Sequence, residues 1–194
     1  MRLTTLFATA AAGLGGAGAA AYVGLVTGRL SLDLAIGRRT RPLGPITVNI
    51  AAPREIVYTA AVAPYAERQP RAMAEKVRIL DRTDQMVLAA HHTPVGNRLT
   101  AVTLETVTFD PPKRIGFRLV RGPVPMVTET FALEPIDSAT RLTYTGELGT
   151  DLWRLGELWG DLVTRSWIQA VEGSLELIKA ESERRAGNNR QPTP

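Results

Sequence analysis

The stretch that decides the fold is WGDLVTRSWIQAVEGSLELIKAESERRA, residues 159–186. Its apolar residues recur at three- and four-residue spacing and its charged residues fall on the other side, which predicts a long amphipathic helix. Asp151 stands where it can cap a short lead-in over 152–158, and Gly187 follows as a stop. One face of this helix therefore needs an apolar surface to cover it. That face comprises Trp159, Val163, Trp167, Ala170, Val171, Leu175 and Ile178.

The chain before this helix supplies strands. ITVNI at 46–50 alternates with period two, and Pro53 then opens a helical stretch that Pro64 divides into two short pieces. Apolar and polar residues then alternate in six further segments, which predicts six strands that each bury one face. They are residues 75–82, 85–93, 97–109, 114–121, 127–133 and 141–148. Short connections make them antiparallel neighbours. The sequence therefore predicts an α+β domain over 46–186, in which a curved antiparallel sheet packs its apolar face on the final helix.

Composition restricts the chemistry. The 194 residues, 44% of them hydrophobic, suit one domain with a real core. The absence of cysteine excludes disulfides, thiolate metal sites and cysteine nucleophiles. No cluster of histidine and carboxylate has metal-ligand spacing, so neither a metal nor another cofactor is expected. The net charge of +4 owes much to four arginines that directly follow an apolar segment, which favours anionic lipid headgroups over nucleic acid. They are Arg29, Arg38, Arg39 and Arg41.

The N-terminal segment predicts a membrane anchor. Residues 3–27 carry no charge and are numerous enough to cross a bilayer core of about 30 Å. Because four arginines follow it and only Arg2 precedes it, the positive-inside rule gives a single-pass protein with its folded domain in the cytoplasm. A cleaved signal peptide ending at the small residues 19–21 is the alternative. The expected division is an anchor over 1–28, a basic linker over 29–45, the domain over 46–186 and a disordered tail over 187–194.

Four stretches before the final helix carry a family resemblance. They are VNIAAPREIVYTAAVAP (48–64), FDPPKRIGFRLV (109–120), TETFALEP (128–135) and TRLTYTGEL (140–148). In these stretches, and in the order strand, two short helices, six strands and long helix, the chain resembles the SRPBCC, or START-like, superfamily, and most closely its polyketide cyclase/dehydrase branch. The resemblance implies a helix-grip fold with a hydrophobic cavity between sheet and final helix. Proteins of this superfamily hold lipids, sterols, polyketides or other apolar molecules there, and they share no universal catalytic residue.

Three polar side chains are candidates for a site. Glu129 shares strand parity with Phe131 and so should point to the apolar side, where a carboxylate needs either a partner or a proton. It then either acts on a ligand or reaches an arginine or water at the sheet rim. Glu105 is a second candidate of the same kind. His91 and His92 are adjacent on one strand and face opposite sides, so they cannot share a metal, and the inward one serves either proton transfer or structure.

The expected function is the binding or transfer of a hydrophobic small molecule or lipid by a membrane-tethered START-like domain. The alternative is a polyketide cyclase/dehydratase-like enzyme that uses Glu129, Glu105 or His91 in general acid/base catalysis. A non-catalytic interaction scaffold is the second alternative. The expected ligand-binding residues are Phe117, Glu129, Phe131, Tyr144, Trp159, Val163 and Trp167.

Overall fold

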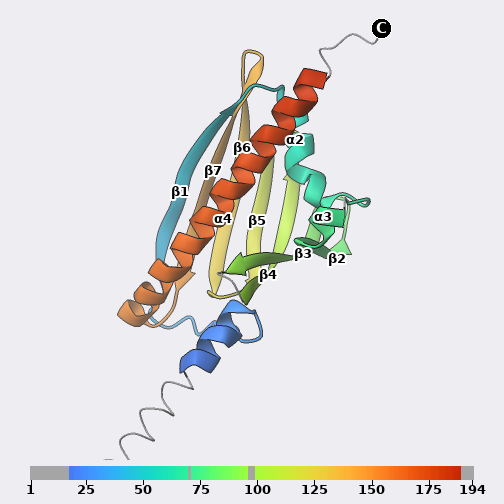
Figure 1. Cartoon of the computed structure of the whole chain (residues 1–194). Helices are drawn as coiled ribbons and strands as arrows, with labels where there is room; N and C mark the ends of the chain where they lie inside the picture. The colour runs from blue at the N-terminus through green and yellow to red at the C-terminus, as the bar shows by residue number, and fades with distance from the viewer. Residues whose placement is uncertain (1–17, 70, 96–98, 189–194) are drawn as a thin grey trace, which may run out of the picture.

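The computed structural model describes residues 18–69, 71–95 and 99–188 (Figure 1). The elements in these ranges are β1 (Arg39–Ile50), α2 (Arg54–Val62), η1 (Ala63–Tyr65), α3 (Arg71–Ala74), β2 (Val77–Arg82), β3 (Met86–Val95), β4 (Leu99–Asp110), β5 (Arg114–Arg121), β6 (Met126–Ile136), β7 (Ala139–Thr150) and α4 (Trp153–Asn188). Within the described residues seven strands form one antiparallel sheet, and α2 and α4 lie on one side of it, whereas the helical residues 18–26 lie beyond its end.

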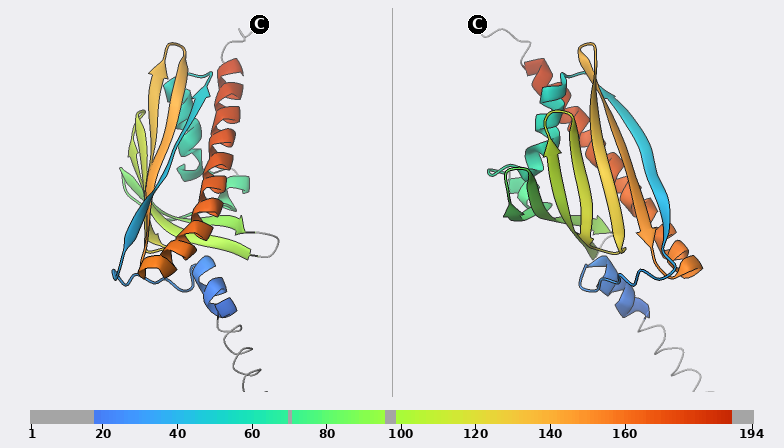
Figure 2. Two further views of the ribbon diagram at one scale, coloured as in Figure 1. Left: turned by 90° about the vertical axis from the view of Figure 1, so that its left-hand side faces the viewer. Right: turned by 180° about the vertical axis from the view of Figure 1, so that it is seen from behind.

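The strands are ordered β1-β7-β6-β5-β4-β3-β2 in the sheet. Every strand from β2 to β7 therefore lies beside its neighbour in sequence, as short antiparallel connections require, and β1 closes the far side by pairing with β7. Figure 2 shows that the sheet is curved and that α4 crosses its concave face. This is the predicted α+β architecture, a curved antiparallel sheet wrapped on a long C-terminal helix.

The core lies between the concave face of the sheet and α4. On the helix Val163, Val171 and Leu175 are buried, and Trp167 is partly buried against the same core, so the predicted apolar stripe does face the sheet. Removing this stripe and the strand residues below it from water supplies the main stabilisation of the fold. The fully buried strand residues that meet it include Ile50, Val87, Val107, Ile115, Val127, Leu142 and Leu148.

The first strand begins earlier than predicted. β1 starts at Arg39 instead of Ile46, so the last part of the expected linker is paired with β7, from Arg39 opposite Thr150 to Leu43 opposite Gly146. This part of the strand was not predicted because Pro42 and Pro45 normally argue against a strand. The structure accommodates them because β1 is an edge strand with an irregular register after Leu43, where missing backbone N–H groups are tolerated.

The last helix is longer than predicted at both ends. α4 runs without a break from Trp153 to Asn188, so the expected lead-in belongs to it and Gly187 does not end it. Asp151 does not cap this helix. Its carboxylate instead accepts hydrogen bonds from the backbone N–H groups of Leu34 and Ala35. A helical beginning of this kind cannot be recognised from the sequence when its nominal capping residue is used by a distant loop.

Most of the predicted anchor lies outside the described residues. Residues 18–26 are helical, and the described part of the chain contains no helix that is both long and apolar enough to cross a membrane. The single-pass arrangement, the cytoplasmic domain and the alternative signal peptide remain predictions. The end of the expected tail, residues 189–194, also lies outside the described residues.

Candidate functional site

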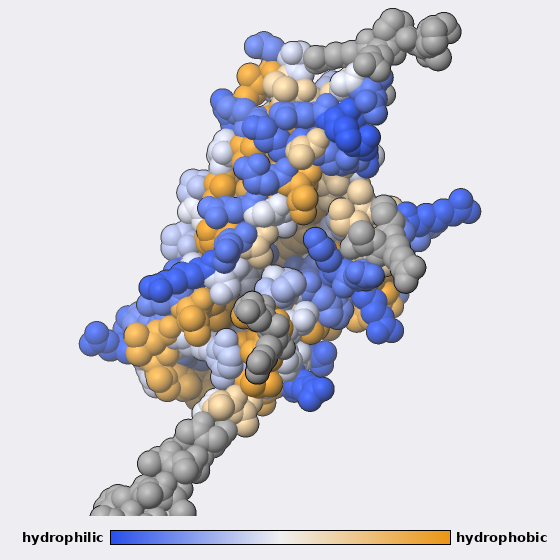
Figure 3. All heavy atoms as spheres, in the orientation of Figure 1, coloured by the Kyte–Doolittle hydropathy of each residue, from blue (hydrophilic) through white to orange (hydrophobic). Residues whose placement is uncertain are grey.

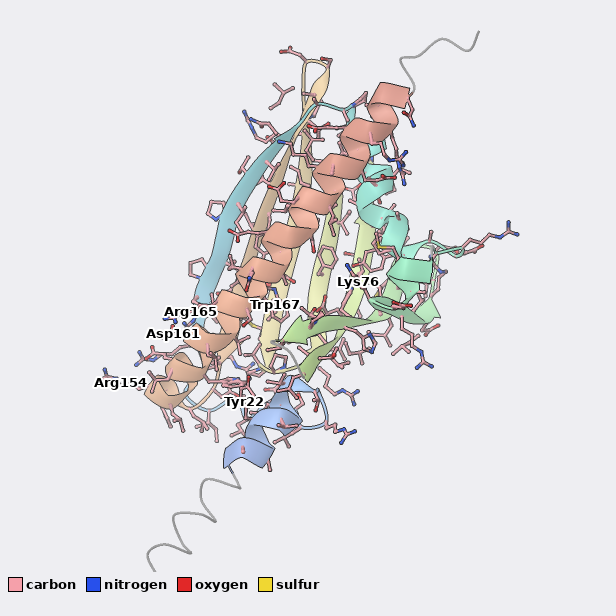
Figure 4. The ribbon with its side chains drawn as sticks, viewed as in Figure 1. Tyr22, Lys76, Arg154, Asp161, Arg165 and Trp167 are labelled. Carbon is pink, nitrogen blue, oxygen red and sulfur yellow. The ribbon has the colours of Figure 1, made fainter. Side chains whose placement is uncertain are left out.

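Glu129 lies on the concave face of β6, on the side that strand parity predicted. It is only 9% exposed. The Tyr144 hydroxyl and the Trp167 indole N–H both donate to its Oε1, each over 2.6 Å. Trp167 comes from α4 and lies between that helix and the sheet in Figure 4. Within the described residues Oε2 receives no hydrogen bond, so this oxygen is available to a ligand.

Gly146 makes room for this carboxylate. It lies directly opposite Glu129 on β7, and a Cβ at this position would come within 3.1 Å of the Glu129 Cγ atom and 2.9 Å of the Thr128 carbonyl oxygen. Any larger residue would therefore displace the Glu129 side chain. A glycine in a strand interior often marks such a close approach.

Glu105 is a second buried carboxylate on the same face, and it is 6% exposed. The Thr103 hydroxyl donates to its Oε1 over 2.6 Å, and the Nδ1 atom of His91 lies 3.2 Å from its Oε2. The latter contact is too poorly aligned for a hydrogen bond, so it acts as an ionic contact. On its other side the imidazole Nε2 lies 3.0 Å from the Tyr65 hydroxyl. His91 is thus the inward-facing histidine of the two.

Glu105 and His91 form an ion pair. Burial on its own raises the pKa of Glu105, but His91 and the Thr103 hydrogen bond outweigh this and lower that pKa below its ordinary value. Burial likewise lowers the pKa of His91, but the charge of Glu105 outweighs it and raises that pKa. When His91 is protonated, both of its ring nitrogens carry a hydrogen, and Nε2 then donates to the Tyr65 oxygen. The Tyr65 hydroxyl hydrogen is then free to be donated elsewhere.

Tyr65 stays neutral at physiological pH. Burial is the main reason that its pKa lies well above the ordinary value, and the charges of Glu105 and Glu129 add to the effect. A buried neutral phenol beside a cationic imidazole is a strong hydrogen-bond donor.

Glu129 behaves in the opposite way from Glu105. Burial, helped by the negative charge of Glu105, raises its pKa to about 7. The hydrogen bonds from Tyr144 and Trp167 and the charge of His91 limit this rise. The carboxyl group is therefore divided between its two protonation states near neutral pH, which is the property that general acid/base catalysis requires.

A row of aromatic rings connects the two carboxylates. Centroid distances are 6.3 Å from Tyr65 to Phe117, 5.2 Å from Phe117 to Phe131 and 5.8 Å from Phe131 to Tyr144, and the last two pairs meet edge to face. The row leads from the hydroxyl partner of His91 to the hydroxyl partner of Glu129. Such walls favour a flat apolar ligand and strengthen electrostatic interactions beside them.

This arrangement was compared with known proteins. No protein-family model and no curated protein sequence matches the chain, whereas many solved structures do. The ZhuI aromatase/cyclase from Streptomyces sp. R1128 superposes with a TM-score of 0.56 at 23% identity, over 76% of this chain and 95% of that one. The chain thus shares the helix-grip fold of this aromatase/cyclase, the fold that the sequence resemblance implied.

Two further structures share this helix-grip fold. The di-domain aromatase/cyclase StfQ of the steffimycin biosynthetic pathway matches with a TM-score of 0.58 at 20% identity, over 78% of this chain and 52% of the di-domain protein. Norcoclaurine synthase from Thalictrum flavum, in complex with dopamine and hydroxybenzaldehyde, matches with a TM-score of 0.58 at 10% identity, over 84% of this chain and 96% of that one. At these identities the likeness is one of fold.

The helix-grip domain brings most of the predicted binding residues together. Glu129, Tyr144 and Trp167 are joined by hydrogen bonds, and Phe117 and Phe131 lie in the aromatic row. Val163 is also buried in the core from the side of α4.

Trp159 lies apart from this group. Its indole N–H donates to the Pro123 carbonyl over 2.7 Å, and its ring packs edge-on against Tyr22 of the N-terminal helix, with centroids 5.9 Å apart. Tyr22 is labelled in Figure 4. It belongs to the end of the domain where the N-terminal segment lies.

The sequence did not reveal Tyr65 or Thr103 as members of the site. Tyr65 follows Pro64 in a short 3-10 helix, where neither strand parity nor a helical stripe indicates direction. Thr103 was one threonine among several in β4. In the described part of the chain, no group of three histidine, aspartate or glutamate side chains could hold a metal ion.

A cavity of about 560 Å³ opens beside the Tyr65 end of the site. Its lining includes Ala66, which follows Tyr65, and Val77, which is paired with His91 across β2 and β3. Arg82 also lines it and donates to the Tyr65 carbonyl oxygen. The cavity lies near the connection between α3 and β2, where Lys76 is labelled in Figure 4. This cavity is therefore lined by neighbours of Tyr65 and His91 and not by these two side chains themselves.

Replacing Tyr144 by phenylalanine is expected to raise the pKa of Glu129 above about 7. The phenol hydrogen bond stabilises the carboxylate form, so its loss favours the protonated form. Glutamate labelled with ¹³C at the carboxyl carbon, followed by NMR over a pH series, measures the change. A Tyr58→Phe variant is the control because Tyr58 makes no hydrogen bond to Glu129, and an unchanged Glu129 midpoint in Tyr144→Phe contradicts this assignment.

Proposed function

We propose that this chain is an enzyme of the polyketide cyclase/dehydratase type, which acts by general acid/base catalysis on a small apolar carbonyl compound held between the sheet and α4. One observation carries the proposal. Two buried carboxylates share one aromatic-lined face, and the pKa of Glu129 is raised to about 7 while that of Glu105 is lowered. Glu129 can therefore take up and return a proton near neutral pH, while Glu105 stays ionised as the partner of His91.

The residues suit the elimination of water from a β-hydroxy ketone. Tyr65, supported by the His91–Glu105 pair, donates a hydrogen bond to the substrate carbonyl oxygen. Glu129 in its carboxylate form removes the proton from the α-carbon, and the electron pair moves onto the carbonyl oxygen as an enolate. The enolate then re-forms the ketone as the β-carbon–oxygen bond breaks. Glu129 returns its proton to the departing hydroxyl, so the products are a conjugated ketone and water.

The structural neighbours support the substrate class. ZhuI and StfQ are named as aromatase/cyclases, and the norcoclaurine synthase structure contains dopamine and hydroxybenzaldehyde, both small aromatic molecules. The aromatic row of this chain suits a planar ligand in the same way. A ketone attached to an aromatic or polycyclic body is therefore the substrate class that we assign.

Binding or transfer of a hydrophobic molecule without chemistry is the second candidate function, in a domain tethered to the membrane. The observation in its favour is that Oε1 of Glu129 already has two donors, Tyr144 and Trp167. A buried carboxylate satisfied in this way also serves structure alone.

Turnover of an aryl β-hydroxy ketone separates these functions. The full chain is mixed with this probe, and formation of the conjugated enone is followed by absorbance while binding is followed by changes in the aromatic NMR signals. The enzyme proposal predicts dehydration faster than in buffer. Binding without dehydration favours the carrier, and failure to bind any apolar ketone contradicts the enzyme proposal.

A further inference from the structure

One end of the molecule exposes large apolar side chains from two segments, the loop that leads into β1 and the first turns of α4. We call this surface the apolar end. Figure 3 shows hydrophobic side chains gathered over the start of α4, at the lower left. Monomeric proteins rarely expose so many neighbouring large apolar side chains without a partner. The members, each between 36% and 69% exposed, are Leu30, Leu32, Leu34, Ile36, Leu152, Trp153, Leu155, Leu158 and Leu162.

Asp151 fixes the two segments to each other. It is buried and accepts hydrogen bonds from the backbone N–H groups of Leu34 and Ala35, over 2.7 and 2.9 Å. It also accepts one from Nε of Arg38 over 2.7 Å. In addition, the Leu152 N–H donates to the carbonyl oxygen of Ile36. The loop is therefore held in one shape, and that shape turns its apolar side chains outward.

The backbone of the apolar end is strained. Of the four non-glycine residues with positive φ in the described part of the chain, Ala35, Leu152 and Trp153 lie here. The Trp153 ring packs on Gly37 so closely that a Cβ there would fall 2.3 Å from it. Such conformations persist only where the surrounding structure imposes them, and they concentrate at functional sites.

The start of α4 carries two apolar stripes. Trp159 and Val163 turn toward the core, as in the rest of the helix. Leu155, Leu158 and Leu162 follow helical spacing on another side and are 67%, 69% and 49% exposed. Since the first stripe already completes the core, the second is available to a partner.

We infer that the apolar end rests on a lipid bilayer. The helical residues 18–26, which belong to the uncharged sequence 3–27, lie at this same end of the domain and are drawn in blue in Figure 1. Trp153 is an aromatic residue of the kind that settles at a membrane interface. Arg29 and Arg154 make no ion pair within the described residues and can meet anionic headgroups. The apolar end thus combines the three features of an interfacial surface. This inference does not depend on the proposed enzymatic function.

Quenching of tryptophan fluorescence tests the inference. The full chain is reconstituted with vesicles of phosphatidylcholine and phosphatidylglycerol that carry brominated acyl chains, which quench only tryptophans close to them. We expect quenching that a Trp153→Phe variant largely loses, because Trp153 is 54% exposed, whereas the Trp159 ring packs on Tyr22 and Trp167 lies against the domain core. A Leu155→Ser/Leu158→Ser variant is expected to lose it as well. The matched control is Leu177→Ser, a leucine further along α4 that is also more than half exposed, which should retain it.

Two results overturn the inference. In the first, the protein co-sediments or co-floats with the vesicles but Trp153 is not quenched, which means that the apolar end does not contact the bilayer. In the second, sedimentation without vesicles shows a dimer that the Leu155→Ser/Leu158→Ser variant abolishes, which makes a second copy of this chain the occupant.

Discussion

Replacing Glu129 by glutamine is expected to lower turnover of an aryl β-hydroxy ketone by roughly two to four orders of magnitude. The amide has the shape of the carboxyl group and keeps an oxygen that accepts from Tyr144 and Trp167, but it cannot take up and return a proton. Steady-state rates near pH 7 measure the loss. Glu134→Gln provides the matched control, because Glu134 is an exposed residue of the same strand. Equal rates for wild type and Glu129→Gln would remove Glu129 from the mechanism.

The same substitution is expected to stabilise the fold at alkaline pH. Below pH 4.5 Glu129 is protonated in both the folded and the unfolded chain, and between 4.5 and about 7 the unfolded chain releases the proton first. Stability therefore falls as the pH rises through this window, and the loss is complete above it. Glutamine has no such penalty, so the free energy of unfolding at pH 8 should exceed that of the wild type by roughly 2–3 kcal/mol. Urea unfolding at pH 5 and 8 measures the difference.

Replacing His91 by alanine is expected to destabilise the fold by about 3–5 kcal/mol, because it leaves the Glu105 carboxylate buried without its counter-charge. The raised pKa of His91 contributes stability that is fully present below pH 6.5, the ordinary value, and is lost as the pH rises above it through the raised pKa of the folded state. The lowered pKa of Glu105 contributes stability that is fully present above pH 4.5, the ordinary value, and is lost as the pH falls below it through the lowered pKa of the folded state. The cost of His91→Ala should therefore be greatest between these limits.

A second substitution shows how much of the destabilisation in His91→Ala comes from the lost ion pair and how much from lost packing. Glu105→Gln removes the charge that His91 neutralises, so the double variant His91→Ala/Glu105→Gln should recover much of the stability lost in His91→Ala. His92→Ala is the matched control, since His92 is the next residue of the same strand and faces away from Glu105. If the double variant is as unstable as the sum of the two single variants, the two side chains are not coupled.

The sequence predicted the sheet and its long helix because both arise from local periodicity. Alternation within each strand determines which side chains face the core, and this pattern alone was enough to predict that Glu129 faces inward. The apolar stripe of α4 likewise predicted both the helix and the side of it that faces the core. The start of β1 was missed because Pro42 and Pro45 normally argue against a strand, and only its position at the edge of the sheet makes them acceptable.

The site could be predicted only in part because its contacts join distant segments. The proximity of His91 to Glu105 depends on the register of β3 with β4, and that of Tyr65 to His91 depends on where a short 3-10 helix docks. No local pattern encodes either relation. The displaced pKa values follow from these contacts and from burial, so they too become visible only in the folded chain.

The direct titration of Glu129 in the wild-type protein tests the central claim most sharply. The full chain is labelled with ¹³C at the glutamate carboxyl carbons, and the signal that disappears in Glu129→Gln identifies the residue. Our account predicts a midpoint near pH 7, as a proton-transfer group in this aromatic-lined site requires. A midpoint at the ordinary value of 4.5 would show that the carboxyl group is ionised and solvated at neutral pH, which contradicts the account.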